Sequence, residues 1–174
     1  MTGAPVIETA RLTLRGMRAS DLPAQAAMMG DPVTARFLGG TPFSREETWR
    51  KMLTGPGMWD WMGYGYWSVE RRADSAVIGQ IGFADFKRDI VPSVENIPEM
   101  GWAFAREAGG QGYASEAAQG ALEWADRALD AAEIVAIIDA ENVRSIRIAE
   151  KSGFTVREEA LYRGAPILLF RRKL

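Results

Sequence analysis

Two segments in the second half of the chain carry the residues best suited to chemistry. The first is a glycine-rich run, Gly109, Gly110, Gln111 and Gly112, which follows an alternating apolar stretch and precedes a strong helical pattern. The first turn of a helix presents unpaired N–H groups and a partial positive charge. Glycines also let a phosphate group approach the backbone closely. The run is therefore a candidate phosphate-binding loop that would need no basic side chain.

Other interpretations of this loop remain open at the level of sequence. It can serve simply as a flexible turn between a strand and a helix, with glycines required only for geometry. A P-loop needs a Gly-Lys-Ser/Thr ending, which is missing here. The dinucleotide pattern GxGxxG would place Ser115 at its third glycine, which disfavours a Rossmann-type protein.

The second segment covers residues 142–154 and reads NVRSIRIAEKSGF. Positions 142, 145 and 149 are three and four residues apart, so they share one face of a helix. Asn142 is suited to cap that helix, and Gly153 to end it. A structural interpretation therefore exists for Asn142 as a cap, and for Ser145 as a small residue packed against its neighbours.

The elements that must position these segments follow from the hydrophobic pattern and predict one domain over residues 1–174 with a mixed α/β fold. Seven strands are predicted, at residues 6–15, 66–71, 77–86, 98–105, 134–138, 154–162 and 166–172. Four helices are predicted, from Ser20 to about Met29, a short one after Ser44, and at residues 113–129 and 142–153. Residues 55–67 form an aromatic, glycine-rich stretch, and residues 87–98 are expected to form a loop.

Composition removes several classes of function. The chain has no cysteine and no histidine, so thiol chemistry is impossible and the commonest general base and metal ligand is missing. The net charge is -2 and no basic patch suits nucleic acid. No stretch resembles a secretory signal or approaches the roughly 20 apolar residues of a membrane span. We therefore expect a cytoplasmic protein with no metal, nucleic-acid or membrane partner.

Both segments resemble motifs of the GNAT superfamily. The run GGQGYASEA is similar to its acyl-coenzyme A loop, Arg/Gln-x-x-Gly-x-Gly/Ala, with Gly112 and Ala114 at the last two fixed positions. Gly109 stands where arginine or glutamine is usual. Residues 142–154 resemble the Asn-x-x-Ser/Ala helix that ends in Glu-Lys-x-Gly-Phe. The runs ASEA, IETARLTLR and RGAPILLFRRK are similar to the subfamily of ribosomal-protein N-terminal (alanine/serine) acetyltransferases.

The resemblance implies a GNAT fold, with a central, mostly antiparallel twisted sheet of six to seven strands and about four helices. It also implies acetyl-coenzyme A as co-substrate, with its pantetheine arm between the strands at residues 98–105 and 134–138. The residues implied to bind it are Trp102, Ala103, Phe104, Gln111, Gly112, Tyr113, Ala114, Ser115, Asn142 and Ser145. A backbone N–H near Trp102 or Ala103 would stabilise the thioester oxygen.

The implied reaction is direct transfer of an acetyl group to a primary amine. Many family members place a tyrosine seven residues after the asparagine as proton donor, but here that residue is Ala149. In the ribosomal-protein subfamily the corresponding candidate is Ser145, which could instead only hydrogen-bond the sulfur or position water. Glu99 is the candidate general base, with an exposed strand-end carboxylate and proton loss to bulk water as the alternatives.

The acceptor is the least determined part of this hypothesis. Trp59, Trp61, Tyr64 and Asp85 are candidates to line an acceptor pocket, although core packing is the other interpretation of the aromatic residues. A peptide N-terminus, an amino acid, a polyamine and an aminoglycoside all remain open as acceptors. A catalytically inactive acyl-coenzyme A-binding module is the alternative function, and the resemblance leaves a homodimer open.

Overall fold

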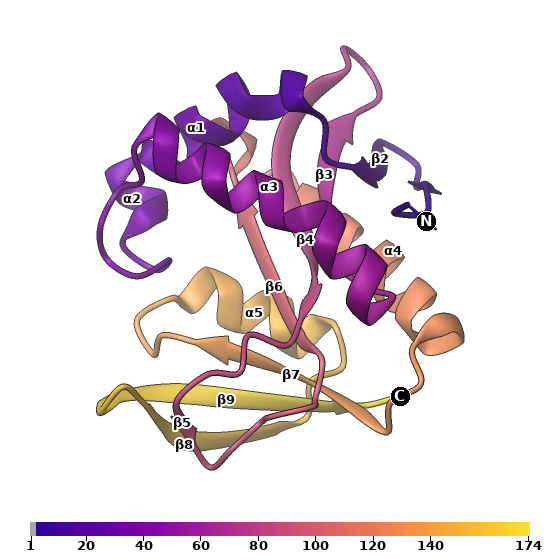
Figure 1. The fold of residues 1–174 in the computed structure, drawn as a ribbon. Coiled ribbons are helices and arrows are strands. Elements are labelled where there is room, and N and C mark those ends of the chain that lie inside the picture. The colour runs from indigo at the N-terminus through magenta and orange to yellow at the C-terminus, as the bar shows by residue number, and fades with distance from the viewer. Residues whose placement is uncertain (1–2) are drawn as a thin grey trace.

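A single nine-stranded sheet runs through the computed structural model, which describes residues 3–174 (Figure 1). Its strands are β1 (Ile7–Glu8), β2 (Leu12–Gly16), β3 (Tyr66–Arg71), β4 (Ala76–Ala84), β5 (Ile90–Val91), β6 (Glu99–Phe104), β7 (Glu133–Ile138), β8 (Val156–Tyr162) and β9 (Ala165–Lys173). The α-helices are α1 (Leu22–Gly30), α2 (Pro32–Ala35), α3 (Arg45–Met62), α4 (Tyr113–Ala128) and α5 (Val143–Lys151). The mixed α/β fold class predicted from the sequence is confirmed.

The order of strands places a defect in the middle of the sheet. The order is β1-β2-β3-β4-β6-β7-β9-β8-β5, and every neighbouring pair is antiparallel except β6 and β7. Those two parallel strands are paired at one position only, where Glu99 lies opposite Val135. Beyond that pair they diverge, so the sheet opens between its two halves.

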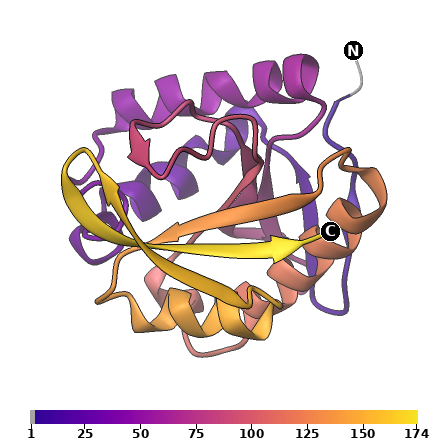
Figure 2. The same cartoon turned by 90° about the horizontal axis from the view of Figure 1, so that it is seen from below.

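Helices cover both faces of the sheet (Figure 2). Helix α3 lies on one side and helices α4 and α5 lie on the other. The face of α4 that meets the sheet consists of small residues and one leucine, namely Ala117, Ala118, Ala121, Leu122 and Ala125, all at most 4% exposed. Small side chains at helical spacing let this helix approach the strands closely.

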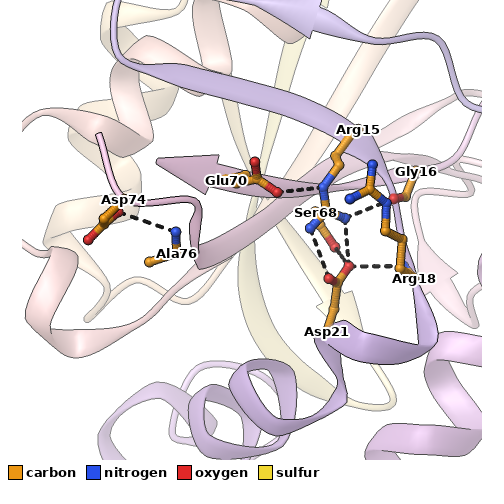
Figure 3. A network of polar contacts seen from close by, with 8 residues as sticks. All are labelled: Arg15, Gly16, Arg18, Asp21, Ser68, Glu70, Asp74 and Ala76. Carbon is orange, nitrogen blue, oxygen red and sulfur yellow. Dashed lines mark hydrogen bonds and ion pairs between the residues drawn. The ribbon is translucent and has the colours of Figure 1, made fainter. Parts of the chain in front are cut away.

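A buried polar network ties α1 to the sheet (Figure 3). The Arg15 guanidinium on β2 donates to both carboxylate oxygens of Asp21, at 2.8 and 2.9 Å, and to Glu70 at 2.7 Å. Ser68 on β3 and the Arg18 N–H also donate to Asp21. Asp21 immediately precedes α1, so this network fixes where that helix begins.

The same network shifts the pKa values of Asp21 and Arg15. Burial by itself would raise the pKa of the Asp21 carboxyl, but the hydrogen bonds from Arg15, Arg18 and Ser68 outweigh that effect and lower it below 3.8. The hydrogen bond to Asp21 raises the pKa of Arg15, against the opposing effect of burial. Asp21 and Arg15 are therefore both ionised in the folded protein although they are 3% and 6% exposed.

The number of elements exceeds the prediction for local reasons. The predicted first strand is split into β1 and β2 because the Thr9 hydroxyl accepts from the Leu12 N–H and closes a turn between them. The predicted loop at residues 87–98 contains the two-residue strand β5, which pairs with β8. The four-residue helix α2 is also additional, and Asp31 caps it by accepting from the Val33 N–H.

The largest difference concerns α3, which the sequence indicates only as a short helix. It has 18 residues and continues through Gly55, Pro56 and Gly57 to Met62, where Gly63 ends it with a φ of 73°. The helix is held by tertiary packing, since Trp59 lies edge-on against Trp67 with the ring centroids 4.8 Å apart. Such packing overrides the low helix propensity of glycine and proline. Across residues 3–174, no helix has the length and apolar character needed to cross a membrane.

Candidate active site

A cavity of about 820 Å³ opens where β6 and β7 diverge. One side of it is formed by α1, by α3 and by the segment between α2 and α3, and the other by the end of β7 and the start of α5. Residues that line it include Gln25, Lys51, Tyr66, Arg88, Glu99, Gly101, Trp102, Ala103, Ile138, Asn142, Ser145, Tyr162 and Arg163. The defect in the sheet thus brings the second predicted segment, through Asn142 and Ser145, to the same space as Trp102 and Ala103 on β6.

Trp102 and Ser145 meet at this cavity, as two of the predicted cofactor-binding residues. The Trp102 indole N–H donates to Ser145 Oγ at 3.2 Å, and the Ser145 N–H donates to Asn142 Oδ1 at 3.1 Å. Asn142 is therefore a helix cap and also lines the cavity. Because Ser145 Oγ accepts from the indole, its own hydrogen is free to be donated to another group.

Glu99 lines the same cavity, but it is engaged by a neighbouring cation. Both of its carboxylate oxygens accept from Arg88, at 2.6 and 2.9 Å, and Arg88 also donates to Tyr162 Oη at 3.1 Å. Burial would lower the pKa of Arg88, but its hydrogen bond to Glu99 outweighs this and raises it. Since each Glu99 oxygen already accepts a charge-assisted hydrogen bond, its geometry is that of a group that holds Arg88.

Tyr66 also lines the cavity, although it is not among the site residues predicted from the sequence. On β3 it lies opposite Gly82, and Gly82 lies opposite Gly101 on β6. A side chain at Gly101 would place its Cβ 2.1 Å from Tyr66 Oη, so the phenol occupies the space above that glycine. Burial, and to a lesser extent Glu99, raises the pKa of Tyr66, which keeps its hydroxyl protonated as a donor. Gly82 and Gly101, which lie inside strands, are the sequence signal that another group approaches the backbone closely here.

The glycine loop has the backbone geometry expected of an anion site. Gly110 and Gly112 have φ values of 76° and 80°, which side chains rarely adopt. Gly112 precedes α4 and supplies no side-chain cap, so the first N–H groups of the helix have no capping acceptor. These N–H groups belong to Tyr113, Ala114 and Ser115, all predicted to bind the cofactor. The loop lies outside the 820 Å³ cavity.

Arg11 contacts three residues of the loop and the first turn of α4. It donates to the Gln111 carbonyl at 2.9 Å and to Glu116 at 2.7 Å, and its guanidinium lies 4.5 Å from the centroid of the Tyr113 ring. Tyr113 is 9% exposed and packs in the core. The Tyr113 ring is therefore occupied by Arg11, while the Tyr113 backbone N–H lies at the uncapped start of α4.

Arg144, on α5, is a residue that the sequence analysis did not select. A Cβ built at Gly109 would lie 3.6 Å from Arg144 Nη1. A guanidinium therefore lies beside the one loop position at which this chain departs from the Arg/Gln pattern. Residue types alone gave no signal for this, because Arg144 comes 35 positions later in the sequence.

The four predicted acceptor-pocket residues do not line the cavity. Trp59 is a core residue, 5% exposed, because its indole donates to the Tyr66 carbonyl at 3.2 Å and packs against Trp67. Trp61 is on the same helix but 88% exposed. Tyr64 packs against the core, and Asp85 is paired with Lys87 at 2.6 Å. Of the predicted cofactor residues on β6, Trp102 and Ala103 line the cavity and Phe104 does not.

Comparison with known proteins decides the family. A family model described as an acetyltransferase (GNAT) domain matches residues 11–155. The chain belongs to the GNAT family of acetyltransferases. This GNAT acetyltransferase is 30% identical to the uncharacterized protein YkkB of Bacillus subtilis, over 99% of this chain and 98% of that protein.

Solved structures agree with this membership. A putative GnaT-family acetyltransferase from Bordetella pertussis matches with a TM-score of 0.83 and 29% identity, covering 97% of this chain and 99% of that one. The fold is also that of RimL, a ribosomal L7/L12 alpha-N-protein acetyltransferase in complex with coenzyme A, with a TM-score of 0.78 and 18% identity over 98% of both chains. The family and fold implied by the two motifs are thus confirmed, and the GNAT chain is an acetyltransferase.

Proposed function

We propose that this GNAT acetyltransferase moves an acetyl group directly from acetyl-coenzyme A to a primary amine inside the 820 Å³ cavity. The observation that carries the proposal is the single-pair contact between β6 and β7, which opens the sheet so that one cavity reaches both of its faces. A donor bound on the α5 side and an amine bound on the α3 side would meet there without a covalent enzyme intermediate.

The residues present fit acetyl-coenzyme A, which supplies a thioester whose carbonyl an amine can attack. The uncapped N–H groups of Tyr113, Ala114 and Ser115 suit the diphosphate. Arg144 would add positive charge beside Gly109. The backbone of β6 beyond Glu99 has no partner on β7 and is free to pair with the pantetheine amides. That the RimL structure contains coenzyme A agrees with this assignment.

The roles that we propose for side chains follow from their hydrogen bonds. Ser145, oriented by Trp102, donates its free hydrogen toward the departing sulfur. A backbone N–H near Trp102 or Ala103 stabilises the thioester oxygen, and the protonated Tyr66 hydroxyl orients the amine. Because Glu99 is already paired with Arg88, water is the immediate acceptor of the amine proton.

The test is release of the coenzyme A thiol with a panel of peptides, amino acids, polyamines and aminoglycosides, together with mass spectrometry of the acetylated product. We expect at least one amine to release thiol and gain one acetyl group in equal amounts. Ala149, in place of the usual tyrosine, is the observation that favours an inactive acyl-coenzyme A-binding module. Tight binding of acetyl-coenzyme A with no turnover of any amine would decide for that module.

A further inference from the structure

The cavity carries more positive than negative charge along its lining, although the whole chain has a net charge of -2. Its charged lining residues are Arg36, Lys51, Arg88 and Arg163 against Glu99 and Asp139. Arg36 pairs with Glu141 and Arg88 pairs with Glu99. The ion pairs formed within residues 3–174 include neither Lys51 nor Arg163.

Two of these cations share one aromatic ring. The guanidinium carbon of Arg88 lies 5.1 Å from the centroid of the Tyr162 ring, and that of Arg163 lies 5.3 Å from it. Arg163 and Gly164 form the turn between β8 and β9 with φ values of 50° and 79°, so the backbone at Arg163 is fixed by a tight hairpin. Arg163 is therefore held beside Tyr162 by the fold of the hairpin.

Lys51, on α3, forms a cluster of three cavity-lining cations with Arg88 and Arg163. Its ammonium lies 4.9 Å from the centroid of the Phe43 ring. Desolvation and, to a lesser extent, the charge of Arg88 lower the pKa of Lys51. Glu99 is the carboxylate that pairs with this cluster, and both of its oxygens already accept hydrogen bonds from Arg88.

An excess of positive charge in a partly enclosed, partly apolar space favours binding of an anion. The acetyl donor already has its own anion site at the start of α4, and α4 covers the opposite face of the sheet from α3 (Figure 2). The cluster therefore faces the acceptor half of the cavity.

We propose that the acceptor amine of this enzyme also carries a carboxylate, which Lys51, Arg88 and Arg163 bind at the mouth of the cavity. This inference rests on the proposed amine acetylation. A carboxylate is planar and matches the fork of N–H groups on a guanidinium. The α-carboxylate of a free amino acid and the acidic side chain of an N-terminal aspartate supply the same chemistry, whereas polyamines and aminoglycosides carry only positive charge and would be repelled.

The experiment compares matched acceptors by thiol release from acetyl-coenzyme A. Phenylalanine against phenylalaninamide tests a free amino acid, and Asp-Phe-amide against Asn-Phe-amide tests a peptide start. The amine of phenylalaninamide is less basic, so more of it is neutral and intrinsic reactivity favours the amide. We expect the acid of at least one pair to have the higher kcat/KM, by about tenfold or more for a charge-assisted contact.

Variants then assign the preference to residues. Lys51→Gln and Arg163→Gln should each raise KM for the preferred acid about tenfold, with little change in kcat or in the kinetics of its amide. Arg50→Gln on α3 and Arg157→Gln on β8 are matched controls, because neither residue lines the cavity. A preference that survives in the Lys51 and Arg163 variants would contradict the assignment.

The outcomes separate this inference from the proposed function. Turnover with equal or better use of the amide in both pairs would overturn the carboxylate site and leave amine acetylation standing. If no amine is turned over, amine acetylation fails, and calorimetry on the coenzyme A-loaded protein decides the site. If N-acetylphenylalanine binds more tightly than its amide, and the Lys51 and Arg163 variants lose that difference, the carboxylate site is upheld. Equal binding of the two compounds would reject the carboxylate site.

Discussion

Trp102 and Ser145 come from different elements, β6 and α5, and meet through one hydrogen bond of 3.2 Å. In a chain without histidine, this hydroxyl is the side-chain donor best placed beside the diverging strands. Its position depends on the N-terminal cap of α5, where Asn142 accepts from the Ser145 N–H. The functional and the structural interpretations of Asn142 are thus compatible, because the cap orients the residue that lines the cavity.

Replacement of Ser145 tests this role. Ser145→Ala should lower kcat about tenfold, which corresponds to loss of roughly one hydrogen bond to the transition state. Affinity for acetyl-coenzyme A, measured by calorimetry, should change little because the cap of α5 uses backbone N–H groups. Ser152→Ala, at the other end of the same helix, is the control. An unchanged kcat in Ser145→Ala would remove the hydroxyl from the mechanism.

Gln25 connects stability with function. Its side chain is 1% exposed and lines the cavity, and neither amide atom has a hydrogen-bond partner within residues 3–174. A buried unpaired amide costs about 1–3 kcal/mol. Gln25→Met should therefore raise the free energy of unfolding by about that amount, while KM for the acceptor rises. Urea denaturation and steady-state kinetics measure the two effects.

Gln119→Met on the exposed face of α4 is the matched control for Gln25→Met, and it should change neither quantity. A Gln25→Met protein that is less stable than the wild type would show that the amide is satisfied in solution. Unchanged kinetics would show that the amide only borders the cavity.

Arg144 allows a test of the donor side. Arg144→Ala should raise KM for acetyl-coenzyme A about tenfold and leave KM for acetyl-pantetheine, which has no diphosphate, unchanged. Arg127→Ala, in the last turn of α4 and far along that helix from the loop, is the control. Equal effects on both donors would mean that Arg144 supports the fold of the loop and does not contact phosphate.

At the scale of elements, α1 is positioned by charge. Removal of one member of the buried pair leaves the other without compensation, so Asp21→Ala should cost about 3–5 kcal/mol of unfolding free energy. Because α1 also carries Gln25 and Met29 to the cavity, the same change should loosen the wall of the cavity that α1 forms. Denaturant unfolding near neutral pH measures the first effect. Asp74→Ala, which removes the more exposed ion pair with Arg71 at the turn between β3 and β4, is the control.

The same pair also predicts how stability depends on pH. The folded pKa of Asp21 is lowered relative to the ordinary value of 3.8, so its stabilising contribution is complete above that value and is lost as the pH falls through the folded pKa. We therefore expect the wild type to lose stability below pH 3.8 more steeply than Asp21→Ala does. Parallel curves for the two proteins would contradict the assignment.

At the scale of the whole molecule, local pattern predicted most of the elements, because strand and helix periodicities are properties of neighbouring residues. The predicted strands lie within two residues of the observed ones at each end, apart from the split at Thr9 and the added β5. Contacts between distant segments were not predictable in this way. The position of Tyr66 above Gly101 depends on the register of three strands, and Trp59 enters the core only because α3 continues through Pro56.

The same distinction explains which of the predicted site residues the structure brings together. Ser145 and Asn142 both line the cavity, and their relation is local because they are three residues apart at the start of one helix. Arg88, Arg163 and Lys51 come from a loop, a hairpin turn and a helix, and no spacing in the sequence links them. The part of the cavity where we propose that the acceptor binds is assembled from such distant segments, and the acceptor is what the sequence left undetermined.

One rung joins the two halves of the sheet, between Glu99 and Val135. The relative angle of the two halves is consequently set by helices and loops. On the edge of β6 that faces β7, the backbone groups beyond Glu99 stay open to exchange with solvent, whereas the other edge of β6 is paired with β4. A pantetheine arm seated there would act as a substitute strand that completes the ladder. We expect donor binding to slow hydrogen exchange along β6 and β7, so that the enzyme becomes a mechanically continuous sheet only while it holds its acetyl donor.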